Sequence, residues 1–150
     1  MRTKIITGAL LLASCVVLVF TVFAKSTHPY RNGSVWSVSF IRMEPGMESA
    51  YLEYVATDWK KVMDAMKSEG LILSYKVLTT EGHDGEDWNI MLMSEYKDMA
   101  TMEANENKEE AVAMKAVGDD AKMREGYKQR MNMRSIIGSR MAREIILESK

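Results

Sequence analysis

The side chains best suited to hold a small molecule lie on one predicted helix and two predicted strands. Tyr51, Tyr54 and Trp59 recur at near-helical spacing, so their rings could line an aromatic pocket. Trp36 and Trp88, on strands, could complete its walls. Aromatic residues at this spacing more often form an ordinary core. The pattern therefore leaves two interpretations open, a pocket for a small apolar ligand and a packed core without a cavity.

Polar residues near these rings could orient a ligand, and they are Ser37, Ser39, Asp58 and Asn89. A cofactor-independent oxygenase or isomerase needs such a group to hold or deprotonate its substrate. Burial would make Asp58 a candidate base, whereas exposure would end that role. A convergent pair such as Asp58 with Asn89 would favour an enzyme, and purely apolar walls would favour a binding protein.

Metal and cofactor chemistry is weakly supported. His83 lies beside Asp84, Glu86 and Asp87, but these ligands are crowded into one loop without zinc or EF-hand spacing, so a solvated hairpin is the better interpretation. His28 would be the fourth residue after signal cleavage, where a copper site at the new N-terminus wants the third. We therefore predict no metal site and no cofactor.

Two methionine pairs offer a possible copper site. Met91 with Met93 and Met131 with Met133 could hold Cu(I) through thioethers, but methionine also fills irregular cores, which explains the pairs more simply. The chain has no HExxH pattern, glycine-rich phosphate loop, or serine or cysteine nucleophile motif. Classical hydrolases and nucleotide-dependent enzymes are set aside.

The elements that must position these residues are predicted from periodicity and turn signals. Period-two alternation around Trp36 predicts a strand, and Gly70 suits the left-handed cap that ends a helix. The expected elements, in chain order, are a strand at 35–43, a helix from Met47 to about Met66 with Val62 on its apolar side, a strand at 71–78, a hairpin loop at 79–87, a strand at 88–96, a helical region from Asp98 to about Met133 broken near Gly118, and a strand at 139–147 opened by Gly138.

This order is β-α-β-β-α-β, so we predict an α+β, ferredoxin-like domain with a four-stranded antiparallel sheet and helices on one face. The strand at 88–96 is apolar on both sides, Ile90 and Leu92 on one and Met91 and Met93 on the other, which predicts a central position. One layer of helices covers only one side of such a sheet. We expect a second copy of the chain to cover the other, giving a homodimer.

The chain resembles the dimeric α+β barrel superfamily, which includes antibiotic-biosynthesis monooxygenase-type and stress-responsive barrel proteins. The resemblance spans about residues 35–147 and depends on the first strand, the turn at Glu44–Gly46, the helix with Tyr54 and Trp59, Gly70, and Trp88. It implies a dimeric barrel with a pocket in each protomer between sheet and helices. It implies no reaction, because members range from cofactor-free oxygenases to haem-degrading enzymes and proteins without known activity. The haem-degrading members use a pocket histidine, and no predicted helix here carries one.

The N-terminus predicts export. Arg2 and Lys4 precede an uncharged apolar run over residues 5–24, which is typical of a signal peptide cleaved after Ala24. The alternatives are an uncleaved membrane anchor over residues 5–24 and lipidation of Cys15. We expect residues 1–24 as signal peptide, 25–34 as tether and 35–150 as one domain, in the periplasm or secreted.

The charge and the cysteine content limit the classes of partner that the exported domain is expected to bind. Removing the two positive charges of the signal takes the formal net charge from −1 to −3, and the remaining lysines and arginines are interspersed with acids. Such a chain is a poor nucleic-acid binder, because binding requires phosphate neutralisation by a basic surface. The single cysteine lies in the signal, so the exported domain has no thiol.

Three functions remain open from the sequence. The first is an exported dimeric barrel that binds a small, largely apolar molecule. The second is a cofactor-independent oxygenase or isomerase that uses the same pocket. The third is a structural or protein-interaction module without a ligand, which solid packing of the aromatic residues would favour.

Overall fold

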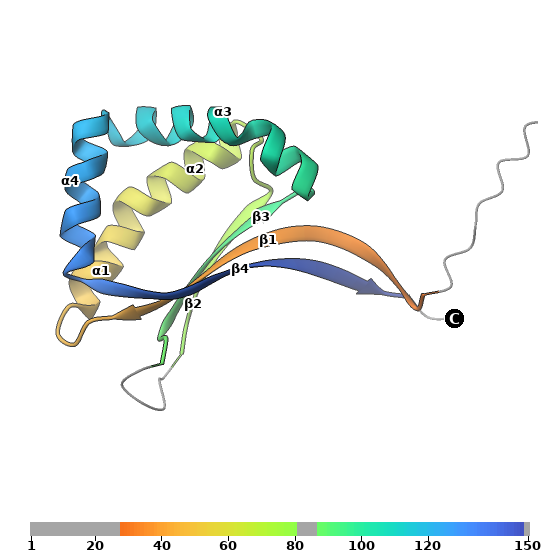
Figure 1. The fold of residues 1–150 in the computed structure, drawn as a ribbon, viewed down its shortest axis with the longest axis horizontal. Coiled ribbons are helices and arrows are strands. Elements are labelled where there is room, and N and C mark those ends of the chain that lie inside the picture. The colour runs from red at the N-terminus through yellow and green to blue at the C-terminus, as the bar shows by residue number, and fades with distance from the viewer. Residues whose placement is uncertain (1–27, 81–86, 149–150) are drawn as a thin grey trace, which may run out of the picture.

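The computed structural model describes residues 28–80 and 87–148, which form an antiparallel four-stranded sheet with helices on one face (Figure 1). Its strands lie in the spatial order β2-β3-β1-β4. The elements are β1 (Tyr30–Met43), α1 (Glu48–Tyr54), the π-helix η1 (Val55–Trp59), α2 (Lys60–Ser68), β2 (Ser74–Thr79), β3 (Ile90–Tyr96), α3 (Met99–Val117), α4 (Asp120–Met131) and β4 (Arg134–Leu147). This chain order and sheet order confirm the predicted ferredoxin-like α+β fold.

The first and last strands, β1 and β4, are both longer than the sequence predicted. β1 begins at Tyr30, so the segment expected to be a tether, residues 25–34, contributes its last five residues to a strand. Residues 30–32 pair with residues 145–147 beyond a register shift, which extends β1 and β4 away from the helices as a two-stranded ribbon (Figure 1). Asn32 and Gly33 are common turn residues, so the sequence predicted a tether here and not a strand.

β4 also begins earlier than expected, at Arg134 and not at residue 139. Gly138 lies inside the strand, next to the register shift opposite Phe40 and Ile41. Glycine suits both a turn and a β-bulge, so the sequence alone did not distinguish them.

The connection between the first helical segment and β2 is part of the core. Gly70 has a φ of +69°, and the N–H of Leu71 donates to the carbonyl of Met66 at 3.0 Å, which confirms the predicted left-handed cap. Leu71 and Ile72 are buried but lie before the strand, which begins at Ser74. The prediction of a strand from residue 71 was wrong because burial of a connecting segment produces the same apolar run.

The π-helix η1 turns the second half of the first helical segment relative to the first half. The N–H of Lys60 donates to the carbonyl of Val55, five residues earlier. One extra residue in a helix of 3.6 residues per turn rotates the rest of the helix by about 100°. As a result Met63 enters the core at 8% exposure, whereas Val62, which uninterrupted helical spacing placed on the apolar side, is only half-buried.

The two faces of the sheet are covered differently. Ile41, Ile90 and Leu92 face the helices and belong to the buried core. Successive side chains alternate between faces, so Met91 and Met93 lie on the opposite face, where they are half-exposed. β3 lies between β1 and β2, which confirms its predicted central position. We call the side away from the helices the open face.

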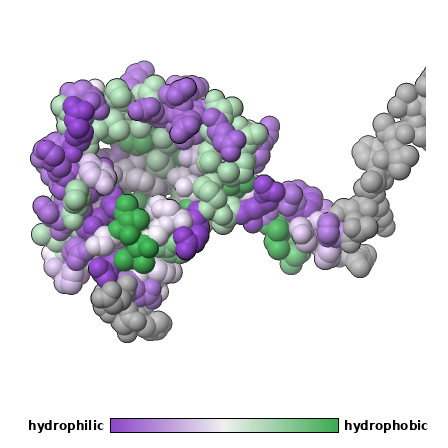
Figure 2. Space-filling view, viewed as in Figure 1, coloured by the Kyte–Doolittle hydropathy of each residue, from purple (hydrophilic) through white to green (hydrophobic). Residues whose placement is uncertain are grey.

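α3 and α4 cover the sheet without burying any of their own residues. The side chains of Asp98 and Asp119 accept hydrogen bonds from the N–H groups of Thr101 and Lys122 and cap the two helices. Gly118, at a φ of +129°, separates them at the predicted position. A hollow is visible beneath these helices in Figure 2. Among the helices within residues 28–80 and 87–148, none is long and apolar enough to cross a membrane.

Candidate functional site

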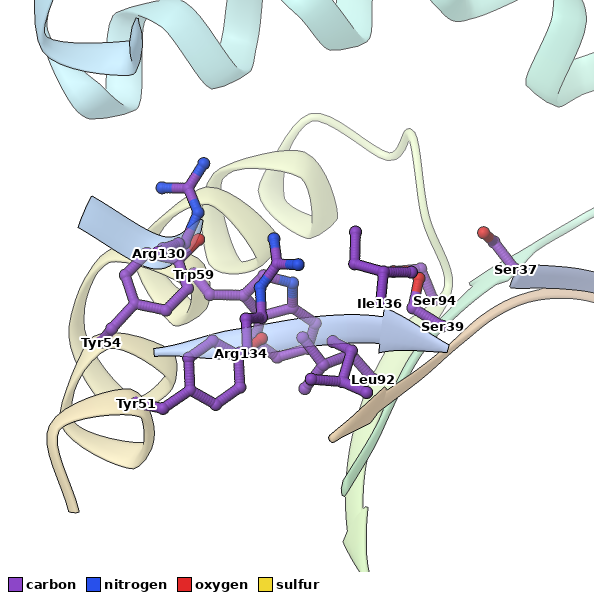
Figure 3. A pocket seen from close by; sticks show the side chains of 11 residues that line it. Ser37, Ser39, Tyr51, Tyr54, Trp59, Leu92, Ser94, Arg130, Arg134 and Ile136 are labelled. Atoms are coloured by element: carbon purple, nitrogen blue, oxygen red, sulfur yellow. The ribbon is translucent and has the colours of Figure 1, made fainter. Parts of the chain in front are cut away.

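A pocket of about 200 Å³ lies between the sheet and the helices, and we call it the central pocket (Figure 3). Its walls come from β1, α1, η1, β3, α4 and β4. The lining residues are Ser37, Ser39, Ile41, Tyr51, Tyr54, Trp59, Leu92, Ser94, Arg130, Arg134 and Ile136.

Three serines supply hydroxyl groups from the sheet. Ser37 and Ser39 are two residues apart on β1, so both point to the helix side. Ser94 lies directly opposite Ser37 on β3, which puts its side chain on the same face. The hydroxyls of Ser37 and Ser39 interrupt an otherwise apolar run of helix-facing residues.

The π-helix positions the aromatic wall. Because a π turn closes between residues five apart, Trp59 returns to the side of the helix that carries Tyr54. The rings of Tyr51 and Tyr54 lie 5.7 Å apart between centroids. Burial raises the pKa of Tyr51 to about 12, although the nearby Arg134 opposes this effect. Burial also raises the pKa of Tyr54, against the influence of Arg130, so both phenols are neutral hydrogen-bond donors at physiological pH.

Two arginines from the last helix and strand complete the pocket. The guanidinium carbon of Arg130 lies 4.8 Å from the centroid of the Tyr54 ring and 5.9 Å from that of Tyr127. The guanidinium of Arg134, the first residue of β4, lies 5.8 Å from the Tyr51 ring. Stacking on aromatic faces holds a guanidinium in place and leaves its N–H edge available.

Neither arginine is neutralised by a carboxylate in the part of the chain that the structure describes, since none of the ion pairs found there includes them. The Nε atom of Arg134 is buried and has no hydrogen-bond partner among the described residues. A buried donor without an acceptor is costly, and a ligand that supplies the acceptor removes that cost. The pocket therefore combines two positive charges with neutral hydroxyl donors, which suits an anion such as a carboxylate.

Five of the seven residues predicted for the site meet in this pocket: Ser37, Ser39, Tyr51, Tyr54 and Trp59. Asn89 does not, because its side-chain Oδ1 accepts a hydrogen bond from the N–H of Met43 at 2.8 Å and so supports the end of β1. Asp58 is exposed and lines a neighbouring cavity. Asp58 and Asn89 therefore do not meet in the central pocket, although the enzyme hypothesis required them to. Because Asp58 is exposed, it is not the buried base that this hypothesis proposed.

The two tryptophans expected on the pocket walls lie elsewhere. Trp36 alternates with Ser37 and lies on the open face, where the Nζ of Lys76 is 4.9 Å from its ring. Trp88 packs edge-on against Phe40, at 5.2 Å between centroids. His28 stacks on Tyr30, at 5.4 Å, and His83 lies outside the described residues.

Sequence reasoning missed Arg130 and Arg134, the residues that give the pocket its charge. An arginine in the last turn of a helix already has an ordinary role, because it complements the negative end of the helix dipole. Arg134 lies opposite Met43 in the sheet, and only this register shows that its side chain points to the helix side. The sequence offered only an indirect signal of a polar pocket. Ser37 and Ser39 place two hydroxyl groups on the strand that forms one wall of the pocket.

Comparison with known proteins shows the fold. No protein-family model matches the chain, and no curated protein sequence matches it. A NIPSNAP family protein of unknown function from Agrobacterium tumefaciens is 10% identical, with a TM-score of 0.51, over 82% of this chain and 96% of that one. A dimeric ferredoxin-like protein from an uncultured marine organism is 17% identical, with a TM-score of 0.48, over 80% and 100%. HapK from Hahella chejuensis is 10% identical, with a TM-score of 0.47, over 73% and 91%.

Proposed function

We propose that this protein binds a small organic anion in the central pocket. The observation that carries the proposal is the pair Arg130 and Arg134, which line this cavity and form no ion pair with a carboxylate within residues 28–80 and 87–148. A carboxylate held there would accept hydrogen bonds from the guanidinium groups and from Tyr51. The rings of Tyr54 and Trp59 would contact the apolar part of the ligand. The largely apolar ligand expected from the sequence thereby becomes an apolar molecule with an anionic group.

An oxygenase or isomerase is less well supported by the same geometry. Both reactions begin by removing a proton from the substrate, which requires a base within hydrogen-bond reach. The residues that line the central pocket include no carboxylate and no imidazole. Tyr51, with its pKa raised to about 12, stays protonated at neutral pH and does not serve as that base. Binding is therefore the function that this set of side chains favours.

The test is a calorimetric titration of the exported chain with benzoate. A cavity of about 150 Å³ with apolar walls is large enough to bind benzene, so a ring of this size matches the pocket. Arg134→Gln keeps a polar, hydrogen-bonding side chain but shortens it and removes its charge, and we expect it to weaken binding by about 10- to 100-fold. Arg124→Gln is the matched control, because Arg124 lies on α4, pairs with Asp120 and lines no part of the central pocket. Equal binding by all three proteins, or by none, would contradict the proposal.

A homodimer through the open face is part of the proposal. This face carries the partly exposed side chains of Trp36, Phe40, Met91 and Met93, and no described helix covers it. Contiguous apolar surfaces of this kind usually mark protein interfaces. Light scattering should give the mass of two chains for the exported protein. Phe40→Lys should give one chain, while Leu52→Lys, on the exposed side of α1, should leave the dimer intact.

Export is a further part of the proposal, supported by the sequence of residues 1–24, which lie outside the described residues. Intact mass of the protein recovered from its host distinguishes the three possibilities. A chain beginning at Lys25 supports cleavage, a full-length chain in the membrane supports an anchor, and an acylated Cys15 supports lipidation.

A further inference from the structure

A second cavity of about 200 Å³ adjoins the central pocket, and we call it the side cavity. Tyr54, Trp59 and Arg130 line both cavities, so the two share one wall. Figure 3 shows these three side chains together at one end of the central pocket. A molecule held at Arg130 is therefore next to the entrance of the side cavity.

The side cavity differs in chemistry from the central pocket. Its inner walls are the apolar side chains of Val62, Ala113, Val117 and Met123, contributed by α2, α3 and α4. Apart from the shared Arg130, its charged lining residues are Asp58 and Lys122, and both of these are exposed to solvent. The interior suits hydrocarbon, because burying an apolar chain there removes its surface from water.

Two features of the fold create this cavity. The π-helix η1 rotates α2 so that Val62 lies at the edge of the core and not within it, where it becomes a wall of the cavity. Gly126 lines the cavity one helical turn before Arg130, and a Cβ at this position would lie 3.1 Å from the Nη1 atom of Arg130. The missing side chain leaves room for the guanidinium between the two cavities.

We infer that the ligand is an amphipathic organic acid that occupies both cavities. This inference rests on the proposed function of the central pocket. The carboxylate lies between Arg130 and Arg134, and a hydrocarbon chain passes Trp59 into the side cavity. Either cavity alone is smaller than the usual range of about 300–1,000 Å³ for ligand sites, and the two together reach it. Short acids thus fill only half of the site.

The experiment is a titration of the exported chain with straight-chain carboxylates from butanoate to octanoate, below their micelle concentrations. We expect affinity to rise about three- to four-fold for each added methylene until the side cavity is full. Val117→Phe fills the cavity from α3 and should remove the gain for the longer acids while leaving butanoate binding unchanged. Met123→Trp does the same from α4 and serves where the first variant fails to fold. Ala111→Phe, exposed on α3 and outside both cavities, is the matched control.

The outcomes separate this inference from the proposed function. If butanoate binds and Arg134→Gln abolishes its binding, but chain length has no effect, the central pocket stands and the side cavity has no part in binding. The inference is also overturned if Val117→Phe weakens butanoate and octanoate equally. If no carboxylate binds, or if Arg134→Gln binds like the parent, the proposed function fails and the inference fails with it.

Discussion

The first helical segment and the second helical pair cover the same face of the sheet but pack against it differently. Tyr51, Val55, Met63 and Met66 from α1, η1 and α2 are buried against the sheet and the chain around it. α3 and α4 together have no buried residue. The first segment thus supplies much of the hydrophobic core, α3 adds half-buried side chains such as Val112 at its edge, and α4 encloses space.

The difference accounts for the position of both cavities. Close packing leaves few voids, so a cavity needs a covering element that does not fill the space below it. α4 meets this condition because residues such as Lys122, Gly126 and Arg130 face the space between it and α2. Stability and ligand binding are therefore expected to depend on different helices, and substitutions in each test this division.

The largest difference is expected from the same truncation made in each segment. Met63→Ala removes a side chain that is 8% exposed and should lower the free energy of unfolding by about 2–4 kcal/mol, because it leaves a void in the core. Met123→Ala only enlarges the side cavity and should cost less than about 1 kcal/mol. Urea denaturation of both variants measures the two values. Equal losses would show that α4 packs as tightly as α2.

Alkaline pH should lower the free energy of unfolding through the ionisation of two buried tyrosines, Tyr51 and Tyr96. Burial raises the pKa of Tyr51 to about 12 from its ordinary 10.0. The pKa of Tyr96 is raised to about 12 in the same way, with Glu109 adding to the effect. Between these values the unfolded phenol is ionised and the folded one is not, so the stability present below pH 10 is lost as pH rises toward 12.

The loss should reach on the order of 2 kcal/mol for each tyrosine by pH 12. Denaturation of the parent, Tyr51→Phe and Tyr96→Phe across this interval measures it, and each variant should show a smaller loss than the parent. Tyr127→Phe is a control, because the Tyr127 side chain is exposed on α4. Identical alkaline profiles for all four proteins would contradict the assignment.

A smaller effect is expected from Glu109 of α3. Its Oε1 atom is buried without a hydrogen-bond partner among the described residues, and its Oε2 accepts a hydrogen bond from the hydroxyl of Tyr96 at 3.2 Å. Burial raises the pKa of the Glu109 carboxyl, so this group favours folding at low pH and that contribution is lost as pH rises through its folded pKa.

Glu109→Gln should therefore raise the stability at pH 7 by less than about 1 kcal/mol and give no gain at pH 4. Thermal unfolding at the two pH values measures this difference. Glu110→Gln, on an exposed neighbour, provides the control. A gain of the same size at both pH values would mean that ionisation of Glu109 is not the cause.

The smallest expected change in stability comes from Gly126→Ala in α4. Alanine favours a helix interior over glycine by about 0.5–1 kcal/mol, so the variant should unfold at a slightly higher temperature. The same Cβ crowds the guanidinium of Arg130 and should weaken carboxylate binding. Unfolding and titration of one sample measure both effects. A stabilised variant with unchanged binding would show that Arg130 does not need this space.

Several features were predictable because they depend on neighbours in the chain. Period-two alternation located β1, a run that is apolar on both sides located β3, Gly70 and Gly118 marked helix ends, and the start of the later helical region was expected at Asp98. The near-helical spacing of Tyr51, Tyr54 and Trp59 was sufficient to bring them together. Local geometry alone produces these results, since each involves residues within about two helical turns or strand repeats.

The charge of the pocket was not predictable in this way. Arg134 enters the pocket because β4 pairs with β1, which puts it opposite a residue 91 positions earlier in the chain. The loss of Asn89 from the site has a similar origin, since a hydrogen bond to the N–H of Met43, 46 positions away, holds its side chain. Asp58 is exposed because η1 turns it away from the sheet.

The sequence by itself determined the order of elements, the fold class and which aromatic side chains share a helix face. These features depend on hydrophobic periodicity and steric preferences among residues that are close together in the chain. Only the tertiary structure decided that Met63 and not Val62 enters the core, and that two arginines complete the polar pocket. Those outcomes depend on one extra residue in a helical turn and on strand register, and both are set by packing between segments far apart in the chain.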